Sequence, residues 1–252
     1  MNTIHTVIRG KKPNPTFPSV VFVGGLSASE EHQTEEWNGS GCVRRVGLQS
    51  MMSNYTETLS FDWPGTGRSP TPQKFPQNMD EEANLVYHLL SHHKIAPPYI
   101  FVAQSIGCYT TLMYAIKYPR HIHAITLIHP PPLSLYTKLS ITKAYEKKHP
   151  SSAERIRSMH ASISRWPSSF KSSRLVVHLD MVPFDAPKAV HERNDKALYE
   201  LERYFPNRIY HMGATPRIHK LDPYPILASI VRFLQPKRKP QSIRKRKRII
   251  PK

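Results

Sequence analysis

Cysteine and glycine are scarce in this chain. Only two cysteines occur in 252 residues, Cys42 and Cys108, and they form neither a disulfide framework nor a spaced set of metal ligands. Cys108 falls in an apolar stretch, where the sequence predicts a small buried hydrophobic residue. The 10 glycines do not form the motif of a phosphate-binding loop. The Gly65-Thr66-Gly67 segment lacks the lysine and the spacing of that motif. The sequence therefore predicts no cofactor and no metal site.

Long hydrophobic runs are absent as well. No stretch approaches the roughly 20 apolar residues that a membrane-spanning helix needs. The N-terminal segment 1–12 also lacks the apolar run of a secretory signal. We therefore expect a soluble, intracellular protein of the cytoplasm or nucleus, which is not secreted and has no transmembrane segment.

Acidic residues are few, since 18 Asp and Glu stand against 36 Lys and Arg, and the net charge is +18. Half of this excess lies in a short tail, 237–252, which contains nine Lys or Arg and no acid. We expect this tail to be disordered. Three alternatives are open for it: contact with nucleic acid or an import receptor, contact with an anionic membrane surface, or no partner at all.

Strand and helix patterns alternate from residue 19 to 235. Short apolar runs rich in β-branched residues predict strands, and longer runs with helical spacing predict helices. This alternation is typical of the α/β fold class, with a mostly parallel sheet flanked by helices, and we expect one domain over 1–236. The expected strands are 3–9, 19–23, 56–62, 99–103, 122–128, 174–179 and 208–212, and the expected helices are 81–92, 106–118, 189–204 and 224–234.

The pattern changes between 132 and 173. This piece contains eight Lys or Arg, two acids and no convincing strand, so we expect a small helical lid insertion between two strands of the sheet. Its charges either keep a solvated cover soluble or attract an anionic substrate or surface. Its apolar residues would roof a pocket; they are Leu133, Leu135, Leu139, Ile141, Ile156, Met159, Ile163 and Trp166.

The segment Ala103-Gln104-Ser105-Ile106-Gly107 indicates chemistry, because it lies between an expected strand and an expected helix. A nucleophilic serine needs a sharp turn, which tolerates only small residues two before and two after it. Ala103 and Gly107 meet this requirement. A helix that begins after Ser105 also directs its N–H groups and its positive dipole end at the place where an oxyanion forms. The alternative is a serine that caps the helix.

This motif and three other landmarks resemble the α/β-hydrolase fold superfamily, in its serine hydrolase branch, over about residues 3 to 235. The other landmarks are Val20–Leu26 (VVFVGGL), Phe61–Ser69 (FDWPGTGRS) and His219, which precedes the closing helix. A serine in the nucleophile position argues against the branches with an aspartate nucleophile, the dehalogenases and epoxide hydrolases.

The resemblance implies that the backbone N–H groups of Leu26 and Ile106 form an oxyanion hole. Gly24 and Gly25 would let the backbone pass close to the serine turn. Gly24 stands where relatives often have a histidine, which usually supports this loop and does no chemistry. The turn that begins at Asp62 is expected to be structural.

The base is expected beyond the last strand, where His219 fits, whereas His211 lies within an expected strand. The acid is expected after the strand 174–179, where it would orient the imidazole. Asp180 is the favoured acid and Asp185 the second choice.

The sequence thus predicts an enzyme, a serine hydrolase that acts on a carboxylic ester or related small-molecule acyl substrate. It would use a Ser105-His219-Asp180 triad and an acyl-enzyme. The alternative is a non-catalytic binding protein with the same fold and a degraded triad.

Overall fold

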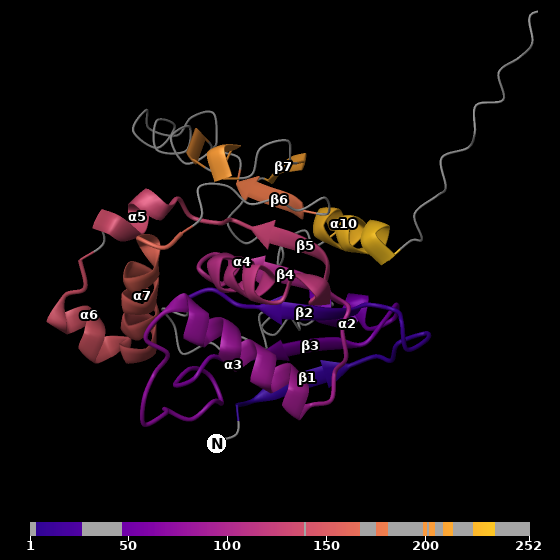
Figure 1. Cartoon of the computed structure of the whole chain (residues 1–252), viewed down its shortest axis with the longest axis horizontal. Helices are drawn as coiled ribbons and strands as arrows, with labels where there is room; N and C mark the ends of the chain where they lie inside the picture. Colours follow the sequence, from indigo (N-terminus) through magenta and orange to yellow (C-terminus); the bar gives the residue numbers. More distant parts are fainter. Residues whose placement is uncertain are drawn as a thin grey trace, which may run out of the picture.

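The strands of the chain form one sheet in the computed structural model, which describes residues 4–26, 47–138, 140–166, 175–180, 199–200, 202–204, 209–213 and 224–234 (Figure 1). The described strands are β1 (Thr6–Arg9), β2 (Ser19–Val23), β3 (Thr58–Phe61), β4 (Tyr99–Gln104), β5 (Ile122–Ile128), β6 (Leu175–Asp180) and β7 (Ile209–Gly213).

The sheet is parallel except at one edge. Its order is β1-β3-β2-β4-β5-β6-β7, and β1 pairs with β3 in the antiparallel sense. The pairs β2–β3, β2–β4, β4–β5, β5–β6 and β6–β7 are all parallel. The carboxyl ends of these strands therefore meet at one edge of the sheet, with β4 at its centre.

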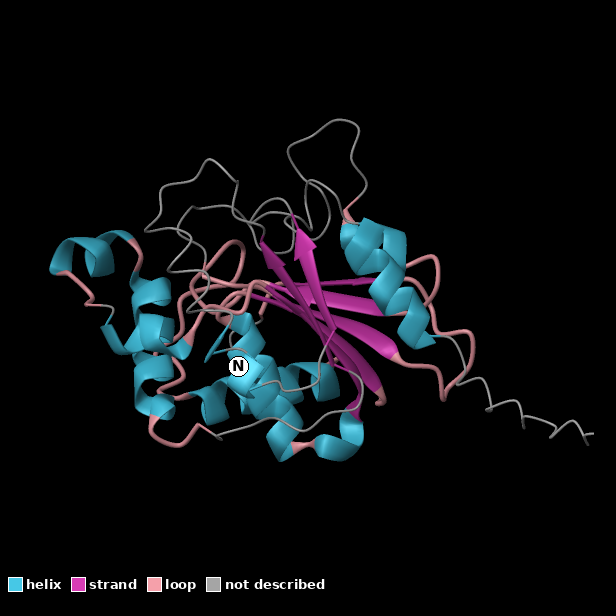
Figure 2. Cartoon of the chain, turned by 90° about the horizontal axis from the view of Figure 1, so that it is seen from above, coloured by secondary structure: helices cyan, strands magenta, loops and turns pink. Residues whose placement is uncertain are grey.

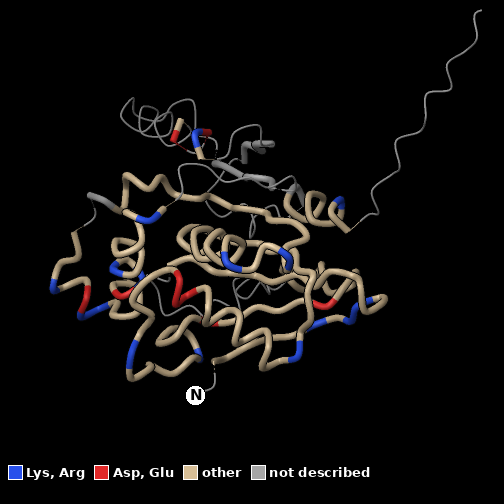
Figure 3. The backbone as a smooth tube through the Cα atoms, in the orientation of Figure 1, with Lys and Arg blue, Asp and Glu red and all other residues tan. Residues whose placement is uncertain are grey.

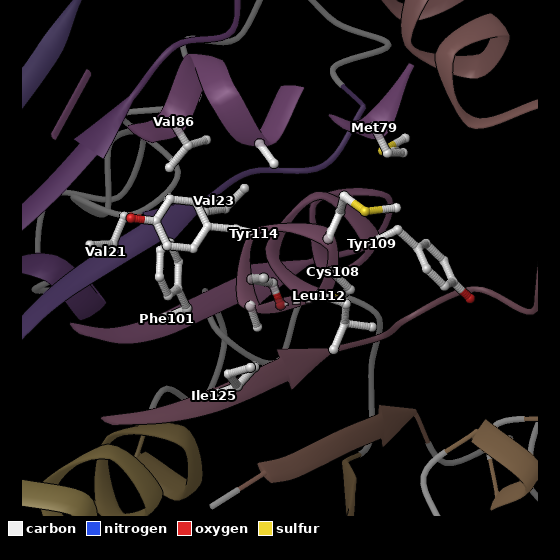
Figure 4. Packing of buried hydrophobic residues seen from close by; sticks show 14 of the residues in the cluster. Val21, Val23, Met79, Val86, Phe101, Cys108, Tyr109, Leu112, Tyr114 and Ile125 are labelled. Atoms are coloured by element: carbon white, nitrogen blue, oxygen red, sulfur yellow. Dashed lines mark hydrogen bonds between the residues drawn. The ribbon is translucent and has the colours of Figure 1, made fainter. Parts of the chain in front are cut away.

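The strands of the sheet centre are apolar on both sides and send alternate residues to opposite faces. On β2, Val21 and Val23 belong to one buried cluster, whereas Val20 and Phe22 belong to another. Figure 4 shows the first cluster, in which Phe101 of β4 lies among side chains of the neighbouring helices. Both faces are buried because helices cover each of them.

Helices α3 (Met79–His92) and α4 (Gly107–Lys117) cover the first face. The other face is covered by α2 (Leu48–Met52) and α10 (Tyr224–Leu234), and Figure 2 shows α10 on its own side of the strands. A short 3-10 helix, Pro119–His121, leads into β5.

The described part of the segment between β5 and β6 contains helices and no strand, in agreement with the expected helical insertion. It contains α5 (Leu133–Lys138), α6 (Lys143–Lys148) and α7 (Pro150–Ile163). In Figure 1 these helices lie together at the end toward which the arrowheads of β5 and β6 point. Basic and acidic residues both occur along this end of the molecule (Figure 3).

Helix α7 attaches the insertion to the rest of the domain. Its Met159 is fully buried in the first core cluster. The Ser162 hydroxyl accepts a hydrogen bond of 2.8 Å from the Met79 backbone N–H at the start of α3. At the other end of α7, Ser151 donates one of 2.6 Å to the carbonyl of Pro64.

The expected elements agree with the structure except in a few places. The strands expected at 3–9 and 56–62 are shorter in the structure, and the helix α2 was not expected. Leu135 is 44% exposed and does not contribute to the apolar face predicted for the insertion, whereas Ile156 is buried there. Most of the helix 189–204, Cys42 and the tail 237–252 lie outside the described residues. None of the helices in the described part of the chain has the length and apolar character needed to span a bilayer.

Candidate active site

Ser105 lies on a strained turn at the carboxyl end of the central strand β4. Its φ is 52°, in the left-handed region that non-glycine residues rarely adopt. The Ser105 N–H donates a hydrogen bond of 2.9 Å to the carbonyl of Ile128 on β5, and the Ser105 carbonyl accepts one of 3.0 Å from Cys108 as α4 begins. A strand, a strained serine and a helix follow one another directly, which is the arrangement of a nucleophile elbow.

The interpretation of Ser105 as a helix cap is wrong. The N-cap of α4 is Ile106, and this N-cap forms no side-chain capping hydrogen bond. A capping serine has extended backbone angles, whereas the φ of Ser105 is positive. The sharp turn at Ser105 therefore needs another explanation than helix capping.

Close backbone contacts explain the small residues around this turn. A Cβ atom on Gly107 would lie 2.5 Å from the Gly24 carbonyl oxygen and 2.7 Å from that of Val23. A Cβ atom on Gly25 would lie 2.8 Å from the Cβ of Ser105. The loop that follows β2 thus packs directly against the serine turn, as the sequence predicts for Gly24 and Gly25.

Trp63 holds this loop from the side of the Asp62–Ser69 turn. Its indole Nε1 donates a hydrogen bond of 3.1 Å to the Gly24 carbonyl, and its side chain is buried. The turn itself is closed by the Asp62 carboxylate, which accepts a bond of 3.0 Å from the Arg68 backbone N–H. The Ser69 hydroxyl also closes the turn, because it donates a hydrogen bond of 2.7 Å to the Asp62 carbonyl. These contacts support the structural role that the sequence suggests for this turn.

The insertion brings a tyrosine to the serine. Tyr136 of α5 is 3% exposed, and its phenol lies beside the Ser105 side chain. Burial raises the pKa of Tyr136, while the nearby Arg155 guanidinium and the Ser105 hydroxyl act in the opposite direction. The phenol therefore stays protonated near neutral pH next to the Ser105 hydroxyl.

Arg155 of α7 is buried, with 5% of its surface exposed. It lies 3.4 Å from the Glu82 carboxylate, which is itself buried and accepts a bond of 2.6 Å from the Thr110 hydroxyl. The Arg155 guanidinium also stacks over the Trp63 ring, with Cζ 3.9 Å from the ring centroid. From the sequence, Arg155 is predicted only as one of eight cations of the insertion. The sequence does contain a pattern that could have indicated the burial of Arg155. Ser151, Arg155 and Ser158 recur at helical spacing and lie on the buried face of α7.

A separate cavity of about 700 Å³ lies between α3 and the proline-rich segment 64–76. Its lining includes Phe75, His88 and His92 but not Ser105. Among the described residues, no group of three or more His, Cys, Asp and Glu side chains is placed to hold a metal ion. The strained Ser105 and the loop that supports it come together at the serine turn, and not at this cavity.

Comparison with known proteins agrees with this geometry. Residues 49–168 match the family model described as alpha/beta hydrolase fold. The enol-lactonase from Burkholderia xenovorans LB400 superposes with a TM-score of 0.64 at 16% identity, over 92% of this chain and 96% of that one. MGS-M2, an alpha/beta hydrolase enzyme from a Medee basin deep-sea metagenome library, gives a TM-score of 0.64 at 15% identity, over 94% and 96%. The chain has the α/β-hydrolase fold.

A curated relative of this α/β-hydrolase-fold chain is similar over a shorter stretch. The probable lysophospholipase BODYGUARD 1 of Arabidopsis thaliana is 29% identical over 118 residues, which are 47% of this chain and 24% of the relative. The chain thus matches about a quarter of the length of that protein.

The remaining predicted site residues of this α/β-hydrolase-fold chain are described to different degrees. Asp180 is the last residue of β6 and pairs with Gly213 of β7, so its backbone lies at the same edge of the sheet as the serine turn. The structure does not describe its side chain. His219 and Asp185 lie outside the described residues.

The two residues predicted for the oxyanion hole are both described. Ile106 follows Ser105 and is fully buried, and Leu26 follows Gly25 and packs against the first core cluster. The structure therefore brings together the serine turn and the loop that carries Leu26, which is the part of the site that backbone geometry alone determines.

Proposed function

We propose that this chain is a serine hydrolase that acts on a carboxylic ester or related acyl substrate. Ser105 attacks the acyl carbon while His219 accepts its proton, and Asp180 orients the imidazole and stabilises its charged form. The leaving group departs with a proton from His219, which leaves an acyl-enzyme. Water then attacks the acyl-enzyme, and its proton passes through His219 as the acid product leaves.

The oxyanion that forms in both steps would be held by the backbone N–H groups of Leu26 and Ile106. The N-terminus of α4 contributes its positive dipole end at the same place. Loss of one such donor typically reduces kcat by a factor of about 10² to 10³. The insertion would cover the substrate, with the Tyr136 phenol facing the nucleophile.

The strained backbone at Ser105 is the observation that carries this proposal. A φ of 52° at a residue with a side chain is unfavourable, and it persists only where the surrounding structure enforces it. Here the flanking strand and helix, the contact of Gly107 with Gly24 and the contact of Gly25 with Ser105 all enforce the turn. Their common effect is to present a hydroxyl at the end of a parallel sheet.

The names of the similar proteins support an ester as substrate. The curated relative is named a lysophospholipase and one structural neighbour an enol-lactonase, and both names refer to carboxylic esters. Hydrolysis of any carboxylic ester requires attack on the acyl carbon, and the proposed Ser105 mechanism supplies this step.

A fluorophosphonate probe tests the proposal directly. We expect the wild-type chain to be labelled covalently and Ser105→Ala to show no labelling, because the probe reacts with an activated serine. His219→Ala should reduce the labelling rate by several orders of magnitude, since no base then accepts the serine proton. A larger loss for Asp180→Asn than for Asp185→Asn would identify the acid. If a folded wild-type chain is not labelled, the proposal is wrong and a non-catalytic binding protein is favoured.

A further inference from the structure

The side chain of Arg155 contacts the loop that carries the proposed oxyanion donor. Its Nη1 lies 2.8 Å from the carbonyl oxygen of Gly25 and 3.4 Å from that of Gly24. The first distance is that of a good hydrogen bond, and a charged donor makes it stronger than a neutral one. A side chain of the insertion therefore contacts the backbone beside Ser105, which lies outside the insertion.

The Gly25 carbonyl and the Leu26 N–H belong to one peptide group. A peptide group is planar and nearly always trans, so its C=O and N–H point in opposite directions. A donor fixed on the Gly25 oxygen consequently fixes the direction of the Leu26 N–H. The cation also polarises the peptide, which strengthens the N–H as a donor toward an anion.

This loop needs support from outside because it cannot support itself. Gly25 has no room for a side chain, since a Cβ atom would lie 2.8 Å from the Cβ of Ser105. Two successive glycines leave the backbone with more freedom than any other pair of residues. Trp63 holds the Gly24 carbonyl at 3.1 Å, and Arg155 is the side chain that holds the next carbonyl.

The guanidinium is itself held in place on its other side. Glu82 faces its Nη2 at 3.4 Å, and Trp63 lies under its plane. Burial lowers the pKa of Arg155 and the Glu82 carboxylate opposes this effect, and an arginine in a protein remains charged. The cluster of Arg155, Glu82 and Trp63 thus presents a rigid positive charge to the Gly25 carbonyl.

We propose that Arg155 is a positioning residue for the oxyanion hole: it sets the plane of the Gly25–Leu26 peptide and so aims the Leu26 N–H at the developing charge. This inference rests on the proposed function. It makes the helical insertion a part of the catalytic apparatus and not only a cover, and it assigns to Arg155 the loop support that a histidine at position 24 often supplies in similar proteins.

The test compares Arg155→Lys with Arg157→Lys, which changes an arginine of the same helix that pairs with Glu146 and Glu154 at the surface. Lysine keeps the charge that faces Glu82, so we expect Arg155→Lys to fold, but its single ammonium lacks the planar fork that contacts Gly25, Gly24 and Glu82 together. The readouts are the rate of fluorophosphonate labelling, and kcat and KM for a short-chain nitrophenyl ester.

We expect Arg155→Lys to lower the labelling rate and kcat by about 10- to 100-fold, because the donor is misdirected and not removed. KM should stay within about twofold, since the oxyanion exists only in the transition state. The inhibition constant of an aryl trifluoromethyl ketone, which forms a tetrahedral oxyanion on the serine, should rise by the same factor as kcat falls. Arg157→Lys should match the wild type in every readout.

Two results would overturn the inference while leaving the proposed function intact. One is a labelled wild type together with a folded Arg155→Lys that reacts at the wild-type rate. The other is a variant in which only KM rises, because that indicates a role in substrate binding and not in the oxyanion hole. A wild type that is not labelled at all overturns the proposed function and this inference with it.

Discussion

Two regions meet at Ser105, and they are built in different ways. The serine turn and the loop after β2 fit together through backbone: Gly107 lies against the carbonyls of Val23 and Gly24, and Gly25 lies against the serine. The insertion approaches the same loop through long side chains, chiefly Arg155, whose partner Glu82 is on α3. In the first region a Cβ atom added to Gly107 or Gly25 would overlap neighbouring atoms, whereas the second region depends on a buried pair of charges.

The difference shows how each region can fail. A backbone contact is lost when a side chain is added, and the cost comes from overlap of atoms. A buried ion pair is lost when one charge is removed, and the cost comes from the remaining charge without its partner. Substitutions of the two kinds therefore separate the contributions of the two regions to stability and to the site.

Removal of one charge from the buried pair should have the largest effect. Glu82→Leu leaves the Arg155 guanidinium buried without its counterion and removes the oxygen acceptor at 2.6 Å from the Thr110 hydroxyl. We expect a loss of about 3–5 kcal/mol in the free energy of unfolding, measured by urea denaturation.

The double variant Glu82→Leu/Arg155→Met is the control for this prediction. Replacement of a buried ion pair by apolar residues of similar volume is often close to neutral, so much of the lost stability should return. A double variant no more stable than Glu82→Leu would mean that the pair does not attach α7 to α3 through its charges.

An added methyl group at the serine turn should have the next largest effect. Gly107→Ala places a Cβ atom 2.5 Å from the Gly24 carbonyl oxygen, and both neighbouring groups are backbone that must shift. We expect a loss of about 1–3 kcal/mol in the free energy of unfolding.

The matched control for the serine turn is Ile116→Ala on the same helix, where the side chain is 45% exposed. Its unfolding free energy should change by about 0.5 kcal/mol or less. Equal losses for the two variants would show that the contact between the turn and the loop is looser than the glycine geometry indicates.

Removal of the two surface ion pairs of Arg157 on α7 should have the smallest effect. The Arg157 guanidinium lies 2.7 Å from Glu146 and 2.5 Å from Glu154, and its side chain is 41% exposed. Arg157→Ala should cost about 0.5 kcal/mol or less, because solvent screens both pairs. The difference from wild type should shrink further in 0.5 M salt, and a cost above that of Gly107→Ala would contradict the distinction between buried and exposed pairs.

The sequence predicted the part of the site that local patterns determine. The strand of β4, the start of α4 and the small residues at Ala103 and Gly107 are close in sequence, so their spacing alone indicates a turn at Ser105. The role of the loop at Gly24 and Gly25 was predicted by the resemblance to known hydrolases. The structure confirms that this loop contacts the serine turn.

The contacts of the insertion were not predicted, because they join residues far apart in the chain. Arg155 and Glu82 are 73 residues apart, and nothing in either neighbourhood distinguishes them from solvated charges. Leu135 shows the converse error, since an apolar residue was assigned to a buried face and is largely exposed. A count of charges and apolar residues in a segment gives its composition and not the face on which each one lies.

The docking of α7 also limits which part of the insertion can move relative to Ser105. Both ends of this helix are bonded to the body of the domain, through Ser151 to Pro64 and through Ser162 to Met79, and its middle is held by Arg155. Helix α6, by contrast, has no buried residue. Movement within the insertion would therefore involve α6, while α7 remains attached to the body of the domain.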